Sequence, residues 1–383
     1  MSDAAKLKVS SFHRAEARLR SFLSPWLLRL WYDCSLVQSR SALYPLLSFS
    51  SELYRFLQKR NARRAGLHRN HLPAYVISIG NLVAGGTGKT PFVIWLAEYL
   101  QSHGLRFAIL SRGYGGQNRT VSRAPEQGDM LSQSFQFGDE PVLLARRLNE
   151  APVWIGRERW LSGQKAIQSG KADVLILDDG FQHFSLFRDL DLVLLDSSNP
   201  FGNGFLLPVG PLREPIHSLQ RAAAFILTRA DDNKKSNETR LTLRRLFPDR
   251  SVFCCRHVLS GFRFGIDGEE VPLATLYGLK AIAFAGIARP ESFFSSITAA
   301  GIRVAEQFAF PDHHFYAPQE VSLLLESLKR NKADLLITTE KDVVRFPAEF
   351  HSTVLTARLD LDFGIDRQKL YDFLGEQIGA IGS

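Results

Sequence analysis

A glycine-rich run at residues 85–90, Gly-Gly-Thr-Gly-Lys-Thr, has the residue types and spacing needed to bind phosphate. Glycines allow backbone N–H groups to point inward at phosphate oxygens, and the lysine can reach the β- and γ-phosphates of a nucleotide. The hydroxyl of the threonine that follows can bind Mg²⁺. We therefore expect the run to bind phosphate through Gly85, Gly86, Thr87, Gly88, Lys89 and Thr90.

The run departs from the usual G-x-x-x-x-G-K-[ST] pattern at one position, because Val83 stands where the first glycine would be. Its flanks nevertheless support phosphate binding. An apolar strand pattern at residues 74–80 precedes it, and Pro91 opens an amphipathic helix pattern that extends to about His103. A helix N-terminus directly after the loop adds partial positive charge. A purely structural loop would explain Gly-Lys-Thr alone, but not this arrangement of strand, loop and helix.

Two adjacent carboxylates, Asp178 and Asp179, follow the apolar run at residues 174–177. An apolar strand that ends in aspartate is how phosphate-loop proteins hold Mg²⁺ opposite the loop threonine. Neighbouring aspartates point in different directions, so we expect one to face the metal and the other a loop or the substrate. A solvated turn would explain Asp-Asp-Gly alone. We predict Thr90, Asp178 and Asp179 as the metal site.

The loops that must position these groups lie at the ends of further predicted strands. Apolar runs at residues 106–110, 152–155, 190–195 and 222–228 alternate with helical patterns. This alternation predicts an α/β fold with a mostly parallel sheet, in which ligands bind outside the carboxyl ends of the strands. The loop with Arg112 and the loop with Asp139 should therefore converge on the phosphate loop, although Arg112 alone would be an ordinary surface arginine.

Composition restricts the class of protein. The chain has 383 residues, of which 45% are hydrophobic and 22% charged, so it is long enough for two domains with cores of their own. This composition excludes wholesale disorder. Three cysteines exclude a disulfide scaffold and match no zinc pattern. The sequence shows no secretory signal and no charge-free apolar run of the roughly 18–20 residues that a spanning helix needs.

A polar run at residues 229–240 predicts a domain boundary. Beyond it, strand patterns at residues 281–285, 335–338 and 353–359 alternate with helical patterns, and residues 262–271 form a candidate hairpin. We predict three segments: a basic amphipathic segment at 1–72, a phosphate-loop domain at 73–228, and a smaller α/β domain at 229–383.

The positive charge is confined to the first of these segments. The whole chain has a net charge of +8, yet residues 1–72 contain 13 Lys or Arg against 4 Asp or Glu. The remaining residues contain 34 against 35. Any anionic partner that the net charge implies should therefore bind the N-terminal segment.

That segment also has apolar residues at helical spacing. Residues 19–31 place leucine, phenylalanine and tryptophan on one face, with arginine and serine on the other. A second stretch, with Leu46, Leu47, Leu53, Tyr54 and Leu57, repeats the pattern and precedes a basic run. Two interpretations remain open on these residues: a helix that lies in a membrane interface, or an ordinary helix that packs on the rest of the protein.

Seven motifs, in order, give the chain a resemblance to a known family. The sequence resembles the tetraacyldisaccharide 4′-kinases, the lipid A 4′-kinases of Gram-negative bacteria, whose phosphate loop also lacks the first glycine. The resemblance extends along nearly the whole chain. The motifs are GNLVAGGTGKTP (80–91), SRGYGG (111–116), GDEPVLLARR (138–147), LDDGFQH (177–183), FGNGFLLPVGPLREP (201–215), PDHH (311–314) and TTEKD (338–342).

The resemblance implies an ATP- and Mg²⁺-dependent kinase. Its reaction would transfer the γ-phosphate to the 4′-hydroxyl of a tetraacylated glucosamine disaccharide 1-phosphate in lipid A biosynthesis. It implies a peripheral or monotopic protein at the cytoplasmic face of the inner membrane. It also favours amphipathic membrane-associated helices within residues 19–57, since the acceptor is a lipid.

The resemblance also implies residue roles. It indicates Asp139 as the base that accepts the proton of the acceptor hydroxyl, paired with His313 from the second domain, with Lys89 as a third catalytic group. His314 is expected to matter less. Arg213 and Glu214 become candidates for contacts with the acceptor or a phosphate, and Arg112 for a substrate contact. The TTEKD motif receives no role.

Two other classes of protein compete with this interpretation. A phosphate-loop NTPase could couple hydrolysis to conformational work. A basic nucleic-acid-binding protein is disfavoured, because the basic residues are interleaved with an apolar helical face rather than gathered in a patch.

Overall fold

The computed structural model describes residues 30–32, 44–67, 69–148, 151–170, 172–231 and 233–379. The chain forms two compact units. The first comprises the chain up to Arg63 together with Leu82–Gly85 and Asn199–Ser218. The second comprises Arg64–Asn81, Gly86–Ser198 and Leu219–Ser383, and contains both sheets.

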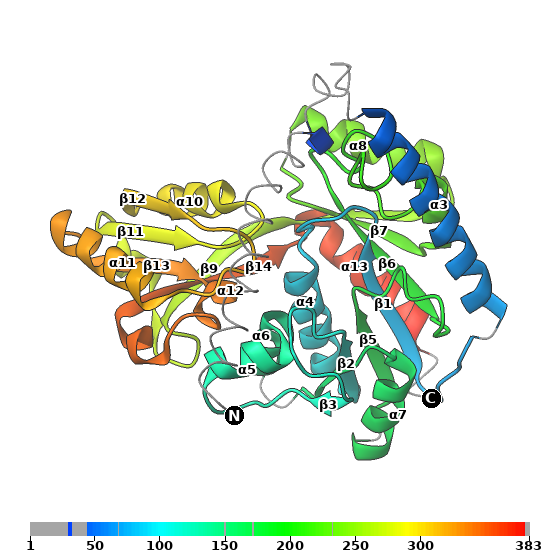
Figure 1. Ribbon diagram of the computed structural model, residues 1–383, viewed down its shortest axis with the longest axis horizontal. Helices are drawn as coiled ribbons and strands as arrows, with labels where there is room; N and C mark the ends of the chain where they lie inside the picture. The colour runs from blue at the N-terminus through cyan, green and yellow to red at the C-terminus, as the bar shows by residue number, and fades with distance from the viewer. Residues whose placement is uncertain are drawn as a thin grey trace. The chain divides into compact units, whose positions relative to one another are not determined.

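The first sheet of the second unit has eight strands in the order β3-β4-β2-β5-β1-β6-β7-β8 (Figure 1). All pairs are parallel except β3 with β4. Every residue of β5, β6 and β7 is buried, as expected for central strands of a parallel sheet covered on both faces. The strands are β1 (Tyr75–Asn81), β2 (Phe107–Ser111), β3 (Ser122–Arg123), β4 (Val153–Ile155), β5 (Val174–Asp178), β6 (Leu190–Asp196), β7 (Ala224–Thr228) and β8 (Ser251–Cys254).

Helices cover both faces of this sheet. Apolar residues of α4 and α13 share one core cluster with β1, whereas α7 packs in a cluster on the opposite face. The predicted mostly parallel α/β sheet is confirmed. The helices of this part are α4 (Lys89–Ser102), α5 (Met130–Phe137), α6 (Asp139–Arg147), α7 (Arg159–Gly170), α8 (Lys234–Leu246) and α13 (Arg367–Ile378).

The first sheet uses residues on both sides of the boundary predicted at 229. Helix α8 and strand β8 follow that position, β8 is the last strand of the sheet, and α13 returns to the same core near the end of the chain. Most of the polar run that suggested a boundary belongs to the first turns of α8, where one side of the helix is exposed and Ser236 and Thr239 on the other side are buried. Polarity there reflects a solvated helix face and not a linker.

The second sheet has six strands in the order β10-β9-β14-β13-β11-β12. Strands β11 to β14 are parallel, and β9 pairs antiparallel with β14 and with β10, which confirms the predicted hairpin. The strands are β9 (Arg256–Phe264), β10 (Glu270–Val271), β11 (Lys280–Ala285), β12 (Arg303–Ala309), β13 (Leu335–Thr339) and β14 (Val354–Asp362). The helices are α9 (Leu273–Leu276), α10 (Pro290–Ala299), α11 (Pro318–Arg330) and α12 (Glu340–Val343).

The first unit is built on helix α3 (Tyr44–Leu67), which holds the loop of residues 199–218 through hydrogen bonds (Figure 1). Ser51 Oγ donates to the Leu206 carbonyl at 3.1 Å, and Tyr54 Oη donates to the Arg213 carbonyl at 3.1 Å. The side of α3 that carries Ser51 and Tyr54 therefore faces this loop.

Another side of α3 exposes large apolar residues. The exposed fractions are 63% for Leu46, 69% for Phe49, 49% for Leu53, 63% for Phe56 and 44% for Leu57. We call these five residues the apolar face of α3. The prediction that Tyr54 shares one face with Leu46, Leu53 and Leu57 is therefore wrong, because the Tyr54 hydroxyl donates to the loop of residues 199–218.

The earlier amphipathic stretch at residues 19–31 lies almost wholly outside the described residues. Within the described ranges, no helix is long and apolar enough to span a bilayer.

Candidate active site

The phosphate loop connects strand β1 to helix α4, as the sequence predicts. Gly88 lies at the N-cap of α4 with a φ of 85°, in the left-handed region. A Cβ atom at this position would lie 2.9 Å from Nε2 of His257. Glycine is therefore required here both by backbone conformation and by space. The turn places Lys89 and Thr90, the first two residues of α4, at the N-terminal end of the helix, where the helix dipole is positive.

Residues at the ends of β6 and β7 hold the loop from outside. Thr228 Oγ1 donates to the Thr87 carbonyl at 2.9 Å, and both terminal nitrogens of Arg229 lie 3.2 Å from the Gly86 carbonyl. Arg229 is itself fixed by an ion pair of 2.7 Å with the buried Asp196. These contacts attach the loop to the carboxyl ends of β6 and β7.

The two predicted metal carboxylates have different partners. Asp178 ends β5, next to β1 in the sheet, and accepts a hydrogen bond of 3.2 Å from Ser111 Oγ. Asp179 has a φ of 52° and lies 3.4 Å from Lys89 Nζ. The loop lysine and the strand-end aspartates therefore form one cluster.

The charge distribution in this cluster suits a hard cation. Burial raises the pKa of Asp178, and the carboxylates of Glu140 and Asp179 raise it further. Lys89 and Arg159 offset part of the effect, which leaves the pKa at about 7. Such crowded carboxylates fit Mg²⁺, which prefers oxygen ligands. Among the residues that the structure describes, no group of three or more His, Cys, Asp or Glu side chains is placed to hold a metal ion. Mg²⁺ usually takes much of its shell from phosphates and water.

Asp139 and His313 are brought together although 174 positions separate them. Asp139 is the first residue of α6, and His313 lies between β12 and α11 with a φ of 62°. Nδ1 of His313 lies 2.8 Å from Oδ2 of Asp139. Gly138, at the N-cap of α6 just before Asp139, has a φ of 94°, and a Cβ there would lie 2.6 Å from the Tyr114 carbonyl, so this position requires glycine. The contact that the sequence analysis expected is therefore present.

The environment of this pair keeps Asp139 ionised. Burial alone would raise the pKa of Asp139, but the hydrogen bond from His313 and the charges of Lys341 and Arg345 outweigh it and hold the pKa below its ordinary value. The Asp139 side chain is 4% exposed and that of His313 is 32% exposed. The imidazole is thus the accessible member of the pair. His314 instead binds Glu320, at 2.9 Å.

Sequence reasoning missed two cations beside this pair. Lys341 lies 3.3 Å from Glu140, and the fully buried Arg345 lies 3.5 Å from Asp139. The signal available in the sequence was the TTEKD motif, which contains Lys341 and ends three residues before Arg345.

Arg159 was missed as well, and no motif marked it. It is the first residue of α7, is buried, and donates to the Gly156 carbonyl at 2.9 Å. Burial lowers the pKa of Arg159 to about 10, against the opposing effect of Asp178. The exposed Arg112 contributes to the same lowering, so these two arginines lie near one another.

The remaining predicted substrate residues lie in the first unit. The backbone N–H of Arg213 donates to the Leu82 carbonyl at 2.8 Å, and Glu214 is buried. Ala84 N donates to the Pro211 carbonyl at 2.7 Å. Both candidates therefore belong to a loop that is fixed against residues 82–84, which lead into the phosphate loop. Substrate contact by Arg112, Arg213 and Glu214 stays a prediction.

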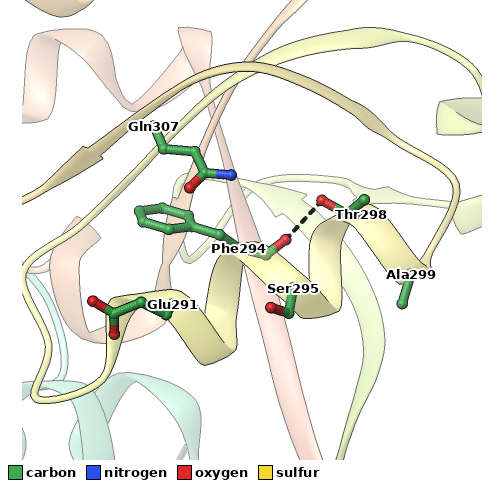
Figure 2. A pocket seen from close by; sticks show the side chains of 6 residues that line it. All are labelled: Glu291, Phe294, Ser295, Thr298, Ala299 and Gln307. Atoms are coloured by element: carbon green, nitrogen blue, oxygen red, sulfur yellow. Dashed lines mark hydrogen bonds between the residues drawn. The ribbon is translucent and has the colours of Figure 1, made fainter.

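A surface cavity of about 480 Å³ lies elsewhere, on α10 and β12. Figure 2 shows the side chains that line it, and none of the predicted site residues is among them. The lining residues are Glu291, Phe294, Ser295, Thr298, Ala299 and Gln307.

Three features define a phosphate-loop nucleotide-binding protein: a mostly parallel sheet, a glycine-rich loop after the central strand β1, and an aspartate at the end of the neighbouring strand β5. This protein also has an acid–imidazole pair of the kind used for proton transfer. The profile of the family described as tetraacyldisaccharide-1-P 4′-kinase matches residues 40–379. The chain belongs to this family.

Individual relatives agree with this assignment. The chain is 46% identical over 370 residues to the tetraacyldisaccharide 4′-kinase of Syntrophobacter fumaroxidans, which covers 97% of this chain and 95% of the relative. It is 39% identical to the enzyme of that name from Syntrophus aciditrophicus, over 90% and 96% of the two chains. The crystal structure of LpxK from Aquifex aeolicus in complex with ATP superposes with a TM-score of 0.68 at 30% identity, over 90% of this chain and 99% of that one.

Proposed function

We propose that the protein transfers the γ-phosphate of ATP to the 4′-hydroxyl of a tetraacylated glucosamine disaccharide 1-phosphate, a step of lipid A biosynthesis. The observation that carries the proposal is the Asp139–His313 pair, which lies in the same compact unit as Lys89 and Thr90. An NTPase that only hydrolyses ATP needs no group to take a proton from a sugar hydroxyl. The named relatives and the ATP complex of the Aquifex protein support the choice of substrates.

The phosphate loop would position the nucleotide. Backbone N–H groups of Gly85 to Thr90 and the Lys89 ammonium would bind the β- and γ-phosphates. Lys89 is already directed by Asp179, at 3.4 Å. Thr90, Asp178 and Asp179 would hold Mg²⁺, which when bound neutralises charge on the phosphates.

The Asp139–His313 pair would take the proton of the attacking hydroxyl. Asp139 is ionised, but its low pKa makes the carboxylate a weak base by itself. The partner imidazole, which is more exposed, lies where an acceptor could meet it. We therefore assign proton acceptance to the two residues as a unit, with Asp139 supplying the negative charge that stabilises the protonated pair.

Arginine side chains would contribute to acceptor binding. A guanidinium has donors in a planar fork that matches a phosphate, so Arg213 is suited to a phosphate of the lipid and Arg112 to the transferred group. Glu214, which is buried beside Arg213 in sequence, would orient that arginine or a sugar hydroxyl.

Incubation of the purified protein with Mg-ATP and the lipid disaccharide tests the function. The expected product is the lipid with the mass of one added phosphate, and ADP release that depends on the lipid. Equal ADP release with and without the lipid, and no phosphorylated product, would support the alternative of an NTPase that couples hydrolysis to conformational work.

We further propose that the protein binds the cytoplasmic face of the inner membrane as a peripheral or monotopic protein. The support is the apolar face of α3, followed by the basic residues Lys59, Arg60, Arg63 and Arg64. Apolar side chains flanked by cations suit an interface with anionic lipid.

Replacing Phe49 and Phe56 with glutamate in the full chain should lower binding to anionic vesicles roughly tenfold or more, because each buried phenylalanine contributes about 1.5–3 kcal/mol. Vesicle flotation at several salt concentrations measures this, and binding of the unaltered chain should weaken as salt rises. Leu241→Glu is the matched control, since Leu241 is 52% exposed on α8. If the double variant and a chain lacking residues 1–60 float as well as the unaltered protein, α3 and the residues before it are docking elements only.

A further inference from the structure

The TTEKD motif has no role in the chemistry above, yet its lysine lies against the proton-accepting pair. We propose that Lys341 is a positioning residue for the phosphoryl transfer: its ammonium fixes His313 in the tautomer with hydrogen on Nδ1 and fastens the His313 loop to the start of α6. This inference rests on the proposed function, in which Asp139 and His313 accept the proton.

Three contacts define the position of Lys341. Its Nζ lies 3.3 Å from Glu140 Oε1, 3.4 Å from Asp312 Oδ1 and 3.4 Å from His313 Nε2. Glu140 follows Asp139 in the chain, and Asp312 precedes His313. One ammonium therefore joins the neighbours of both members of the pair, between the start of α6 and the loop that follows β12.

The chemistry of the contacting atoms selects one tautomer of His313. Asp139 is ionised, so its carboxylate can only accept, and Nδ1 must carry the hydrogen that it donates. The Lys341 ammonium has donors and no acceptor, so the Nε2 atom that faces it must present a lone pair. Both neighbours thus require the same form of the ring, with Nε2 as the basic atom.

The rest of the motif fixes the turn that carries Lys341. Thr339 caps α12 by accepting a hydrogen bond from the backbone of Asp342 at 3.2 Å. The fully buried Asp342 carboxylate accepts hydrogen bonds from Tyr316 at 2.8 Å and from Arg345 at 2.7 Å. Thr339 and Asp342 therefore stabilise the turn itself. Lys341 is the residue of the motif that contacts His313.

The charged groups around His313 determine the expected response to pH. They are Asp139 and Glu140 of α6, Asp312 of its own loop, Lys341 and the nearby Arg345, and Tyr114, whose ring lies 5.9 Å away. Burial alone would lower the pKa of Lys341, but the surrounding carboxylates outweigh burial and raise it, so the ammonium stays charged. Removing the charge of Lys341 leaves mainly carboxylates around the His313 ring.

Kinetics of Lys341→Met and Lys341→Arg in the full chain test the inference. The methionine variant should lose roughly tenfold to a hundredfold in kcat with ATP KM within about twofold, and the acidic limb of its pH–rate profile should move to higher pH. Arginine, which also only donates, should restore most of kcat and the original pH profile. Lys369→Met is the control, because Lys369 forms an ion pair with Asp366 and is 60% exposed.

Nitrogen-15 NMR of His313 in the unaltered protein provides a readout that does not depend on a variant that folds. Hydrogen on Nδ1 alone is expected, and hydrogen on Nε2 of the neutral ring would overturn the inference. An unchanged kcat and pH profile in Lys341→Met would also overturn it while leaving the kinase function intact. A raised ATP KM with the original pH profile would assign Lys341 to nucleotide binding instead. Failure of the proposed function would show separately, as lack of lipid phosphorylation by the unaltered protein.

Discussion

Asp139→Ala and His313→Ala should each lower kcat roughly 10²- to 10⁴-fold, the range that a general base contributes, with little change in ATP KM. The reason is the single hydrogen bond of 2.8 Å that joins them. Without the carboxylate, the imidazole loses the group that orients it. Without the imidazole, the buried carboxylate loses the exposed group through which the pair can take up a proton.

The double variant distinguishes a unit from two independent groups. If the pair acts as one, Asp139→Ala with His313→Ala should be little slower than the slower single variant, because effects within a unit are not additive. Steady-state kinetics at saturating ATP and lipid measure this. Losses that multiply would mean separate roles. His314→Ala is the matched control and should retain nearly full activity, since His314 binds Glu320.

Lys89→Ala and Thr90→Ala should each remove most turnover while the fold stays intact. Lys89 is 14% exposed and is held at the start of α4, so its ammonium has a fixed position for phosphate charge. Loss of one such preorganised group typically costs about 10²- to 10³-fold in kcat. Thr90 is expected to act through Mg²⁺, so its variant should need more Mg²⁺ to reach its own maximal rate.

The measurement is kcat at saturating ATP, with circular dichroism to verify folding. Lys165→Ala is a suitable control, because Lys165 is an exposed lysine of α7 in the same unit. Near-normal turnover in the folded Lys89 or Thr90 variant would contradict the assignment of the phosphate loop.

The local parts of the site were predictable because local sequence determines them. The glycine at the N-cap of α4 and the aspartates at the end of β5 lie at or near the point where a strand is followed by a turn, and such turns have recognisable residue types. The contact of Asp139 with His313 has no local signature, since it joins the start of α6 to a loop 174 positions away, and it was expected only from the resemblance to a family.

Other features could not be predicted because packing determines them. Strand β12 alternates half-buried and exposed residues at the edge of its sheet, so it lacks a strong apolar run. The sequence pattern assigns Tyr54 to the apolar side of α3, because an aromatic residue there is typical of a membrane interface. In the structure its hydroxyl donates a hydrogen bond to the Arg213 carbonyl instead. The roles of Lys341 and Arg345 could not be predicted either, because their partners Glu140 and Asp139 lie about two hundred positions earlier in the chain.

The return of α13 to the first core determines when that core can be completed during synthesis. Trp95 of α4, one turn beyond the phosphate loop, packs on Phe363 at 4.6 Å and on Tyr371 at 5.9 Å between ring centres. A nascent chain that has already produced the loop and all eight strands of the first sheet still exposes this aromatic surface. The nucleotide-binding half therefore finishes folding only after the whole second sheet has left the ribosome, in contrast to domains that fold in order from the N-terminus.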